Sequence, residues 1–168
     1  MTKTAYFWLA IVCASILSPG RAVAQNQPDP ELTPGATNPE VTQETIDETI
    51  CVKGWTRTIR PSTAYTNELK RIGLADYGHA DADTRLFEED HRVPLEVGGN
   101  PVAPRNLWPE PYEGDWNARV KDKLENFARR EVCSKEMSLA DAQALFLGDW
   151  IASFNRYCGP IPESKCPY

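Results

Sequence analysis

The residues with the clearest chemical potential lie together near the middle of the chain. The run EEDH at residues 88–91 places three carboxyl groups directly before His91, one of the two histidines in the sequence. Histidine has an ordinary pKa near neutral pH, so a histidine beside carboxylates is a candidate for proton transfer or for a metal site. The other histidine, His79, follows a glycine, and we expect it to lie in an exposed turn. His91 and its neighbours are therefore the first candidates for a functional site.

The hydrophobic pattern around these residues predicts a hairpin followed by a helix. Residues 86–99 contain the alternating apolar residues Val93, Leu95 and Val97 and end in two glycines, which is typical of a strand entering a turn. Residues 100–108 are predicted to return as a second, irregular strand. From residue 115 the apolar residues recur at helical spacing, which predicts an amphipathic helix of about four turns.

Further elements are expected on both sides of this unit. Residues 51–60 alternate between bulky and polar residues and are followed by Pro61, which predicts an extended segment. Ser62 or Thr63 is expected to cap a helix that runs to about residue 73. Ser138, with Asp141 three residues later, resembles a capping box before a second long helix. The fold class predicted from these elements is α+β.

Several of these residues together resemble a known nuclease motif. They are, in chain order, Asp90-His91, Pro94, Gly98-Gly99, Asn106-Leu107 and Lys121. Their order and spacing resemble the HNH motif, also called the ββα-metal or His-Me finger motif, and residues 86–133 are similar to small exported HNH-like proteins of bacteria. The resemblance implies a small disulfide-containing domain built around a ββα-metal hairpin and helix with flanking helices. It also implies an endonuclease that hydrolyses phosphodiester bonds in DNA or RNA.

The resemblance implies a role for each residue of the motif. His91 would be the general base that activates water, and Asp90 would be a ligand of one divalent metal ion, Mg²⁺ in the first place, with Mn²⁺ or Zn²⁺ as alternatives. Asn106 would orient the histidine ring. Neighbouring residues of a strand point to opposite faces, so Asp90 and His91 can share a site only if the strand bends there.

The chain departs from the motif at the metal ligand on the helix. Ala118 stands where the family usually has a histidine or an asparagine. Asn117, one residue earlier, is the predicted replacement, with Asp122 or Glu125 as alternatives.

Charge bears on how nucleic acid could bind. The chain carries a net charge of −6, so a polycation that coats nucleic acid is excluded and any contact must be local. Arg92, Arg105 and Lys121 are the candidates for binding substrate phosphates, Lys121 by its position in the motif. A second group of basic and aromatic residues suits phosphate contact and base stacking, although an ordinary solvated surface explains each of them equally well. Its members are Lys53, Trp55, Arg57, Arg60, Tyr65, Lys70 and Arg71.

The first 50 residues predict export. Residues 1–24 contain Lys3, an apolar run and the small-residue pattern at 22–24, which together are typical of a cleaved signal peptide. We therefore expect a periplasmic or secreted protein with no membrane-spanning segment after cleavage. Residues 25–50 contain six acidic residues and no lysine or arginine, which predicts a disordered acidic leader before a folded domain at 51–168.

Four cysteines remain after cleavage, and an even number in an exported chain predicts disulfides. We favour the pairs Cys51–Cys133 and Cys158–Cys166, although the sequence leaves three connectivities open.

Two other functions stay open at this point. One is an inactive HNH-like scaffold that binds nucleic acid or a partner in the cell envelope, which Ala118 and the acidic balance favour. The other is a structural protein stabilised by disulfides, in which the motif residues serve only the framework.

Overall fold

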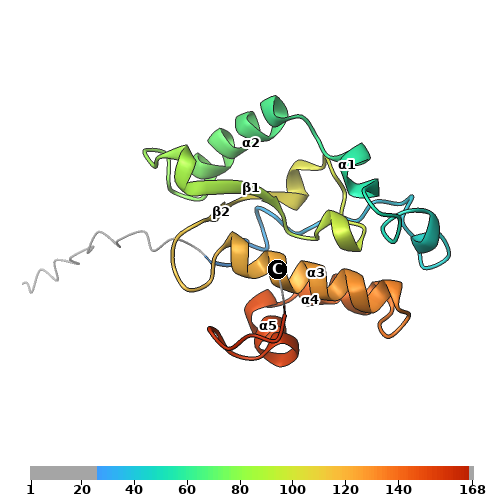
Figure 1. Ribbon diagram of the computed structural model, residues 1–168. Helices are drawn as coiled ribbons and strands as arrows, with labels where there is room; N and C mark the ends of the chain where they lie inside the picture. The colour runs from blue at the N-terminus through green and yellow to red at the C-terminus, as the bar shows by residue number, and fades with distance from the viewer. Residues whose placement is uncertain (1–25, 167–168) are drawn as a thin grey trace, which may run out of the picture.

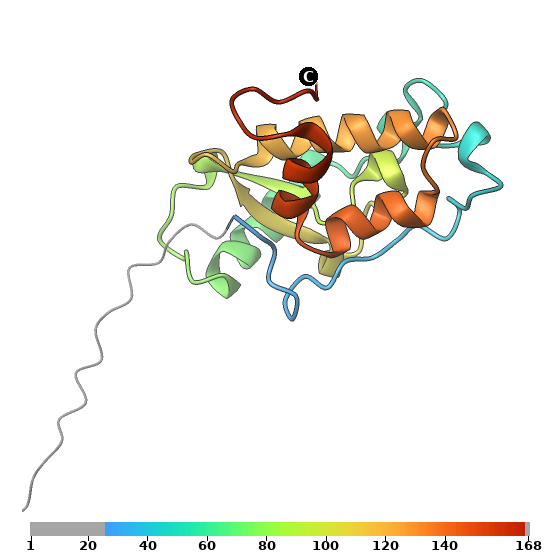
Figure 2. The ribbon, with the colours of Figure 1, turned by 90° about the horizontal axis from the view of Figure 1, so that it is seen from below.

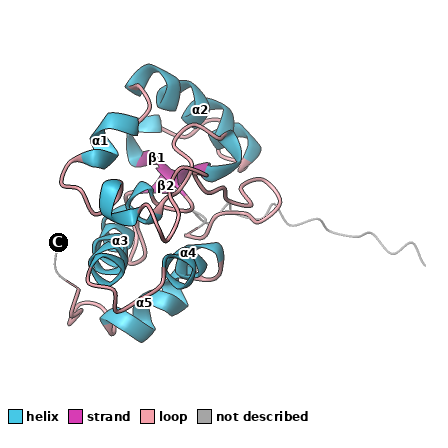
Figure 3. Cartoon of the chain, turned by 90° about the vertical axis from the view of Figure 1, so that its right-hand side faces the viewer, coloured by secondary structure: helices cyan, strands magenta, loops and turns pink. Residues whose placement is uncertain are grey.

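A two-stranded sheet lies between helices on both of its sides (Figures 1 and 3). The computed structural model describes residues 26–166, so the predicted signal peptide at 1–24 lies outside the described residues. Helices α1 and α2 lie on one side of the sheet, and α3, α4 and α5 lie on the other. The elements are α1 (Trp55–Ile59), α2 (Thr63–Asp76), β1 (Phe87–His91), β2 (Leu107–Pro111), α3 (Ala118–Cys133), α4 (Leu139–Leu147) and α5 (Trp150–Cys158). The fold is mixed α+β, as the sequence predicts.

The predicted hairpin forms, but β1 covers only the first part of the expected strand and β2 begins later than expected. Strands β1 and β2 are antiparallel and pair His91 with Leu107. Val93, Leu95 and Val97 were predicted on a strand, and this is wrong: residues 95–97 form a single 3₁₀ turn in the loop between the strands. Proline at position 94 cannot donate a ladder hydrogen bond, and its carbonyl instead accepts from the Gly99 amide at 2.8 Å. The loop therefore closes on itself where a continuous strand was expected.

The prediction for the segment before α2 is partly wrong. Residues 51–60 were expected to be extended, whereas the chain turns at Gly54, which has a φ of 86°, and forms helix α1. That left-handed conformation is one that glycine adopts at little cost, so it allows the turn. The predicted cap of α2 is confirmed, because the Ser62 side chain accepts a hydrogen bond from the Tyr65 amide. Helix α2 continues past Gly73, where a Cβ would lie 3.1 Å from Pro109 of β2.

The C-terminal helical region is divided into two helices. The Ser138 cap is confirmed, since its hydroxyl accepts from the Asp141 amide at 3.0 Å. One long helix was predicted, but α4 ends at Leu147 and α5 begins at Trp150. Asp149 accepts hydrogen bonds from two amides of the first turn of α5, which makes a new helix start there.

Residues 26–50 are folded against the domain, which corrects the predicted disordered leader. Val41, Ile46 and Ile50 are buried in the main core with residues of α3, α4 and α5. The backbone of residues 36–38 pairs with the loop at 98–100, and Figure 2 shows this blue segment passing α4. Five of its six acidic side chains are exposed. The composition is therefore dominated by surface residues, and it does not reveal the few apolar residues that anchor the segment. Residues 26–50 therefore belong to the folded unit.

The favoured cysteine pairs are the ones found. Cys51 and Cys133 form one disulfide, and Cys158 and Cys166 form the other. The first joins the segment before α1 to the last residue of α3, and the second joins the end of α5 to the C-terminal tail. Disulfides persist in oxidising compartments, which fits the predicted export. Between residues 26 and 166 no helix is long and apolar enough to cross a membrane.

Candidate functional site

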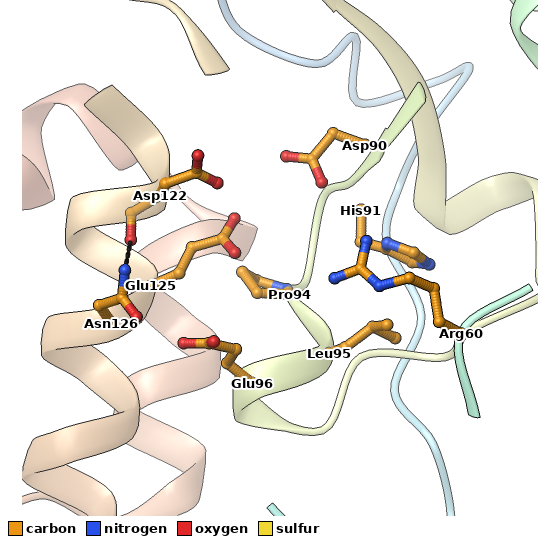
Figure 4. A pocket seen from close by; sticks show the side chains of 9 residues that line it. All are labelled: Arg60, Asp90, His91, Pro94, Leu95, Glu96, Asp122, Glu125 and Asn126. Carbon is orange, nitrogen blue, oxygen red and sulfur yellow. Dashed lines mark hydrogen bonds between the residues drawn. The ribbon is translucent and has the colours of Figure 1, made fainter. Parts of the chain in front are cut away.

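A pocket of about 210 Å³ lies between the end of β1 and one face of α3. We call it the acid pocket because four carboxyl groups line it. Figure 4 shows Asp90 on one side and acidic side chains of α3 on the other, directed toward the same space, with the Arg60 guanidinium beside His91. The full lining is Arg60, Asp90, His91, Pro94, Leu95, Glu96, Asp122, Glu125 and Asn126. The pocket therefore contains two of the predicted site residues, Asp90 and His91.

Asp90 and His91 reach the same pocket although they are neighbours on a strand. His91 is the last residue of β1, and the chain beyond it enters the loop that Pro94 and Gly99 close. Both residues line the acid pocket, but their side chains still alternate as in any strand: the Asp90 carboxylate is directed toward α3, and the His91 ring lies on the other side, beside Arg60 (Figure 4).

The hydrogen bond of His91 determines which ring nitrogen can accept a proton. His91 Nε2 lies 3.1 Å from the Pro101 carbonyl oxygen, and because a carbonyl can only accept, Nε2 is the donor. In the neutral ring Nδ1 is then the free acceptor. The residue is only 4% exposed, and burial lowers the pKa of His91 below its ordinary value. The ring is therefore neutral at physiological pH and can take a proton.

Lys121 lies at the centre of a buried cluster of carboxyl groups. Its Nζ is 2.5 Å from Asp90 Oδ2, 2.5 Å from Glu125 Oε1 and 3.6 Å from Glu110 Oε2. The lysine side chain is 1% exposed. Burial by itself lowers the pKa of Lys121, but these carboxyl groups raise it well above its ordinary value, so the ammonium stays charged.

The carboxyl groups of the cluster differ in charge at neutral pH. Burial alone would raise the pKa of Asp90, but the Lys121 ammonium holds it below its ordinary range, so Asp90 is ionised. Burial raises the pKa of Glu125 to about 8 and that of Glu110 well above its ordinary value. One buried cation is therefore balanced by one buried anion, which limits the cost of desolvation.

The remaining acids of the pocket are partly buried. Burial raises the pKa of Asp122 and of Glu96, and a nearby carboxylate raises each further, although Arg129 near Glu96, Lys121 near Asp122 and Arg60 near both act in the opposite direction. Glu96 Oε2 is buried and has no hydrogen-bond partner among the described residues. Carboxylate oxygens are the ligands that a hard cation prefers. Within residues 26–166, however, no group of three or more His, Cys, Asp or Glu side chains is arranged to hold a metal ion. The carboxylate oxygens of the pocket are of the kind that a hard divalent cation binds. Two of the carboxyl groups, those of Asp90 and Glu125, are already bonded to Lys121.

Asn106 does not contact the histidine that it was expected to orient. Its side chain is fully buried and makes four hydrogen bonds to backbone groups, at the Ala36 amide, both polar groups of Val93 and the Asn100 carbonyl. It therefore fixes the loop after His91, and that loop carries Pro101, whose carbonyl accepts from the ring. Asn106 can therefore act on the ring only through the backbone of this loop.

Asn117 serves the helix and lies outside the acid pocket. Its Oδ1 accepts from the Val120 amide at 3.3 Å, and its Nδ2 donates to the Gly114 carbonyl at 2.7 Å. It is the N-cap of α3, so the prediction that it is a metal ligand is not supported by its position. Asp122 and Glu125, the two alternatives, do line the pocket.

The three predicted phosphate-binding cations are not together. Arg92 is buried and donates to the Thr33 and Leu147 carbonyls, which joins the N-terminal segment to α4. Lys121 is held by carboxyl groups and has no surface to offer to a phosphate. Arg105 is exposed and lines a different pocket, near Tyr77.

A second pocket adjoins the acid pocket and shares two residues with it. This pocket, of about 220 Å³, lies between α2 and β1, and we call it the α2 pocket. Its lining is Arg60, Pro61, Thr63, Thr66, Asn67, Lys70, Glu88, Glu89, His91 and Tyr112. Arg60 and His91 belong to both pockets. The sequence grouped Arg60 and Lys70 as basic residues near aromatics, but nothing in that pattern placed them next to His91.

Comparisons of this chain with models of protein families, with curated proteins and with solved structures found no match.

Proposed function

We propose that this protein is an exported, metal-dependent endonuclease of the HNH type that hydrolyses phosphodiester bonds in DNA or RNA. The observation that supports this proposal most strongly is the state of His91. Its Nε2 donates to a backbone carbonyl, its Nδ1 is free to accept, and the residue lines both the acid pocket and the α2 pocket, as Arg60 does. A neutral, fixed imidazole in such a place has the properties of a general base.

The reaction requires a proton acceptor, and His91 supplies it. Nδ1 takes a proton from the attacking water, while the Nε2 hydrogen bond to Pro101 keeps the ring in the correct tautomer and orientation. As the ring becomes positively charged, the ionised Asp90 next to it stabilises that charge. Arg60, which lines both pockets, is placed to bind the phosphate oxygens.

The carboxylates of Asp90, Asp122 and Glu125 are the residues that would hold a divalent ion, Mg²⁺ in the first place. When bound, such an ion supplies positive charge that stabilises the charge developing on the phosphate oxygens. Lys121 holds Asp90 and Glu125 in fixed positions at the pocket wall. Asn106 fixes the loop that keeps His91 in place.

Cleavage of supercoiled plasmid and of single-stranded oligonucleotides tests the proposal. We expect the oxidised protein to cut in Mg²⁺ or Mn²⁺ and to stop in EDTA. His91→Ala should lose about 10²- to 10⁴-fold in rate, the usual contribution of a general base. His79→Ala is the matched control, since its ring packs against Phe87 and lines neither pocket, and it should cut like the wild type. A folded wild-type protein that cuts neither substrate would contradict the proposal.

One observation favours the second candidate, a scaffold that binds nucleic acid or an envelope partner without cutting. Lys121 already neutralises Asp90, the main candidate ligand, and is bonded to Glu125 as well. In that case the same assay would show oligonucleotide binding without cleavage in any divalent metal.

A further inference from the structure

Helix α2 carries a polar stripe on the face that it turns toward β1. Thr63, Thr66, Asn67 and Lys70 are spaced as i, i+3, i+4 and i+7, which places them on one face of the helix, and all four line the α2 pocket. A helix face packed on a sheet is normally apolar. Here Gly73, one turn later, packs on Pro109, while the stripe borders a cavity. The N-terminal half of α2 therefore faces a ligand-sized space with hydroxyl, amide and ammonium groups.

The cations of this pocket are available to an anion. Lys70 Nζ donates to the Phe87 carbonyl at 3.0 Å, which fixes the ammonium while leaving its other protons free. Across residues 26–166 neither Lys70 nor Arg60 takes part in a carboxylate ion pair. Lys70, held by a backbone carbonyl, and the exposed guanidinium of Arg60 are two charged donors at one pocket, which is an arrangement suited to binding phosphate.

The opposite wall limits which ligand fits. Glu88 and Glu89 lie on the strand side, and Tyr112 completes the lining. A nucleotide matches this lining, because it presents phosphate oxygens that accept from α2 and sugar hydroxyl groups that can donate to the carboxyl groups of β1. The volume of about 220 Å³ is below the roughly 300–1,000 Å³ of pockets that enclose a whole small molecule. A phosphate with part of its sugar is the matching size.

We propose that the α2 pocket binds the phosphate next to the scissile phosphodiester, with Lys70, Asn67 and Thr66 as its donors. Arg60, common to both pockets, then lies between the two phosphates. The strand leaves the site over the N-terminal half of α2 and avoids the acidic face of α3. This inference deepens the proposed function and shares its premise that the ligand is nucleic acid.

Binding of a fluorescently labelled single-stranded DNA 12-mer, measured by anisotropy in EDTA, tests the subsite without any cleavage. Lys70→Gln should raise Kd about three- to tenfold and lower the slope of log Kd against log salt by about 0.7, the value for one lost phosphate contact. Arg71→Gln removes the same charge from the next residue. Its guanidinium is exposed and paired with Glu68 at 2.7 Å, outside the pocket, so Kd should change less than twofold.

Two further variants separate binding from folding. Lys70→Arg keeps the charge and should bind nearly as well as the wild type, and Asn67→Asp should weaken binding by placing a negative charge in the pocket at an exposed helix position. Equal effects of Lys70→Gln and Arg71→Gln, or unimpaired binding by Asn67→Asp, would overturn the subsite. A wild-type protein that binds through Lys70 but never cuts would contradict the proposed nuclease and leave the subsite standing. Failure of the wild type to bind the 12-mer would contradict the subsite.

Discussion

At the scale of single residues, Asp90 and His91 line one pocket together with the alternative ligands Asp122 and Glu125, whereas Asn106 and Asn117 do not. The sequence identifies Asp90 and His91 because residue type and adjacency already point to chemistry. It could not assign Asn106, because the Ala36 amide that Asn106 binds belongs to a segment whose composition predicts disorder. It also predicted that Lys121 binds a substrate phosphate, whereas three carboxyl groups from β1, β2 and α3 hold this lysine inside. Such contacts between distant segments are absent from any local pattern.

Glu89 makes stability depend on pH. Burial raises the pKa of Glu89 from 4.5 to about 8, so the native state keeps a proton that the unfolded chain has released. Stability should therefore fall as pH rises from 4.5 to 8. Glu89→Gln has no proton to lose, and its stability should fall less over this window, by on the order of 2 kcal/mol after allowance for partial solvent access.

Urea unfolding of both proteins at pH 5 and pH 8.5 measures this difference. The exposed Glu31→Gln is the control and should follow the wild type. Parallel losses of stability in the wild type and Glu89→Gln would show that the buried carboxyl is not the cause.

At the scale of elements, the sequence predicts helix starts better than it predicts where chains turn. Ser62 and Ser138 are confirmed as caps because capping depends on one side chain and an amide two or three residues later. The strand positions were missed because the alternation of Val93, Leu95 and Val97 reflects burial in a closed loop, which has the same pattern as a strand. The break at Gly148 and Asp149 was missed because the apolar spacing continues across it.

Asn117 offers a test at this scale, because its two possible roles predict different results. As the N-cap of α3, Asn117→Ala should lower stability by about 1 kcal/mol, and Asn117→Ser should restore most of it. Cleavage at saturating Mg²⁺ should then be unchanged in both variants below their melting temperatures. A loss of metal affinity without a loss of stability would instead support the ligand role that the sequence predicted.

At the scale of the whole molecule, the N-terminal segment is part of the folded unit. Ile46 is 1% exposed in the main core, and the Cys51–Cys133 disulfide joins the end of this segment to α3. The composition of the segment could not predict this. Six acidic residues and several prolines make the segment polar on average, whereas only a few apolar residues attach it to the core. The chain therefore folds around α3 from both ends.

Truncation of one buried side chain in this segment tests its contribution. Ile46→Ala should lower the free energy of unfolding by about 2–5 kcal/mol, as for other buried large-to-small changes. Leu32→Ala, in the same segment but 46% exposed, should change it by less than about 0.5 kcal/mol. Calorimetry of the oxidised proteins measures both, and an Ile46→Ala protein as stable as Leu32→Ala would mean that the segment does not stabilise the fold.

The central claim, that His91 is the base of a phosphodiester hydrolysis, is tested most directly by chemical rescue. His91→Gly leaves a space at the junction of the two pockets, and thermal melting shows whether the variant is folded. In Mg²⁺ we expect it to cut plasmid about 10²-fold or more slowly than the wild type. Added imidazole should restore part of the rate, with a dependence on pH that follows neutral imidazole. A folded His91→Gly protein that cuts at the wild-type rate, or that imidazole does not accelerate, would contradict the role of His91.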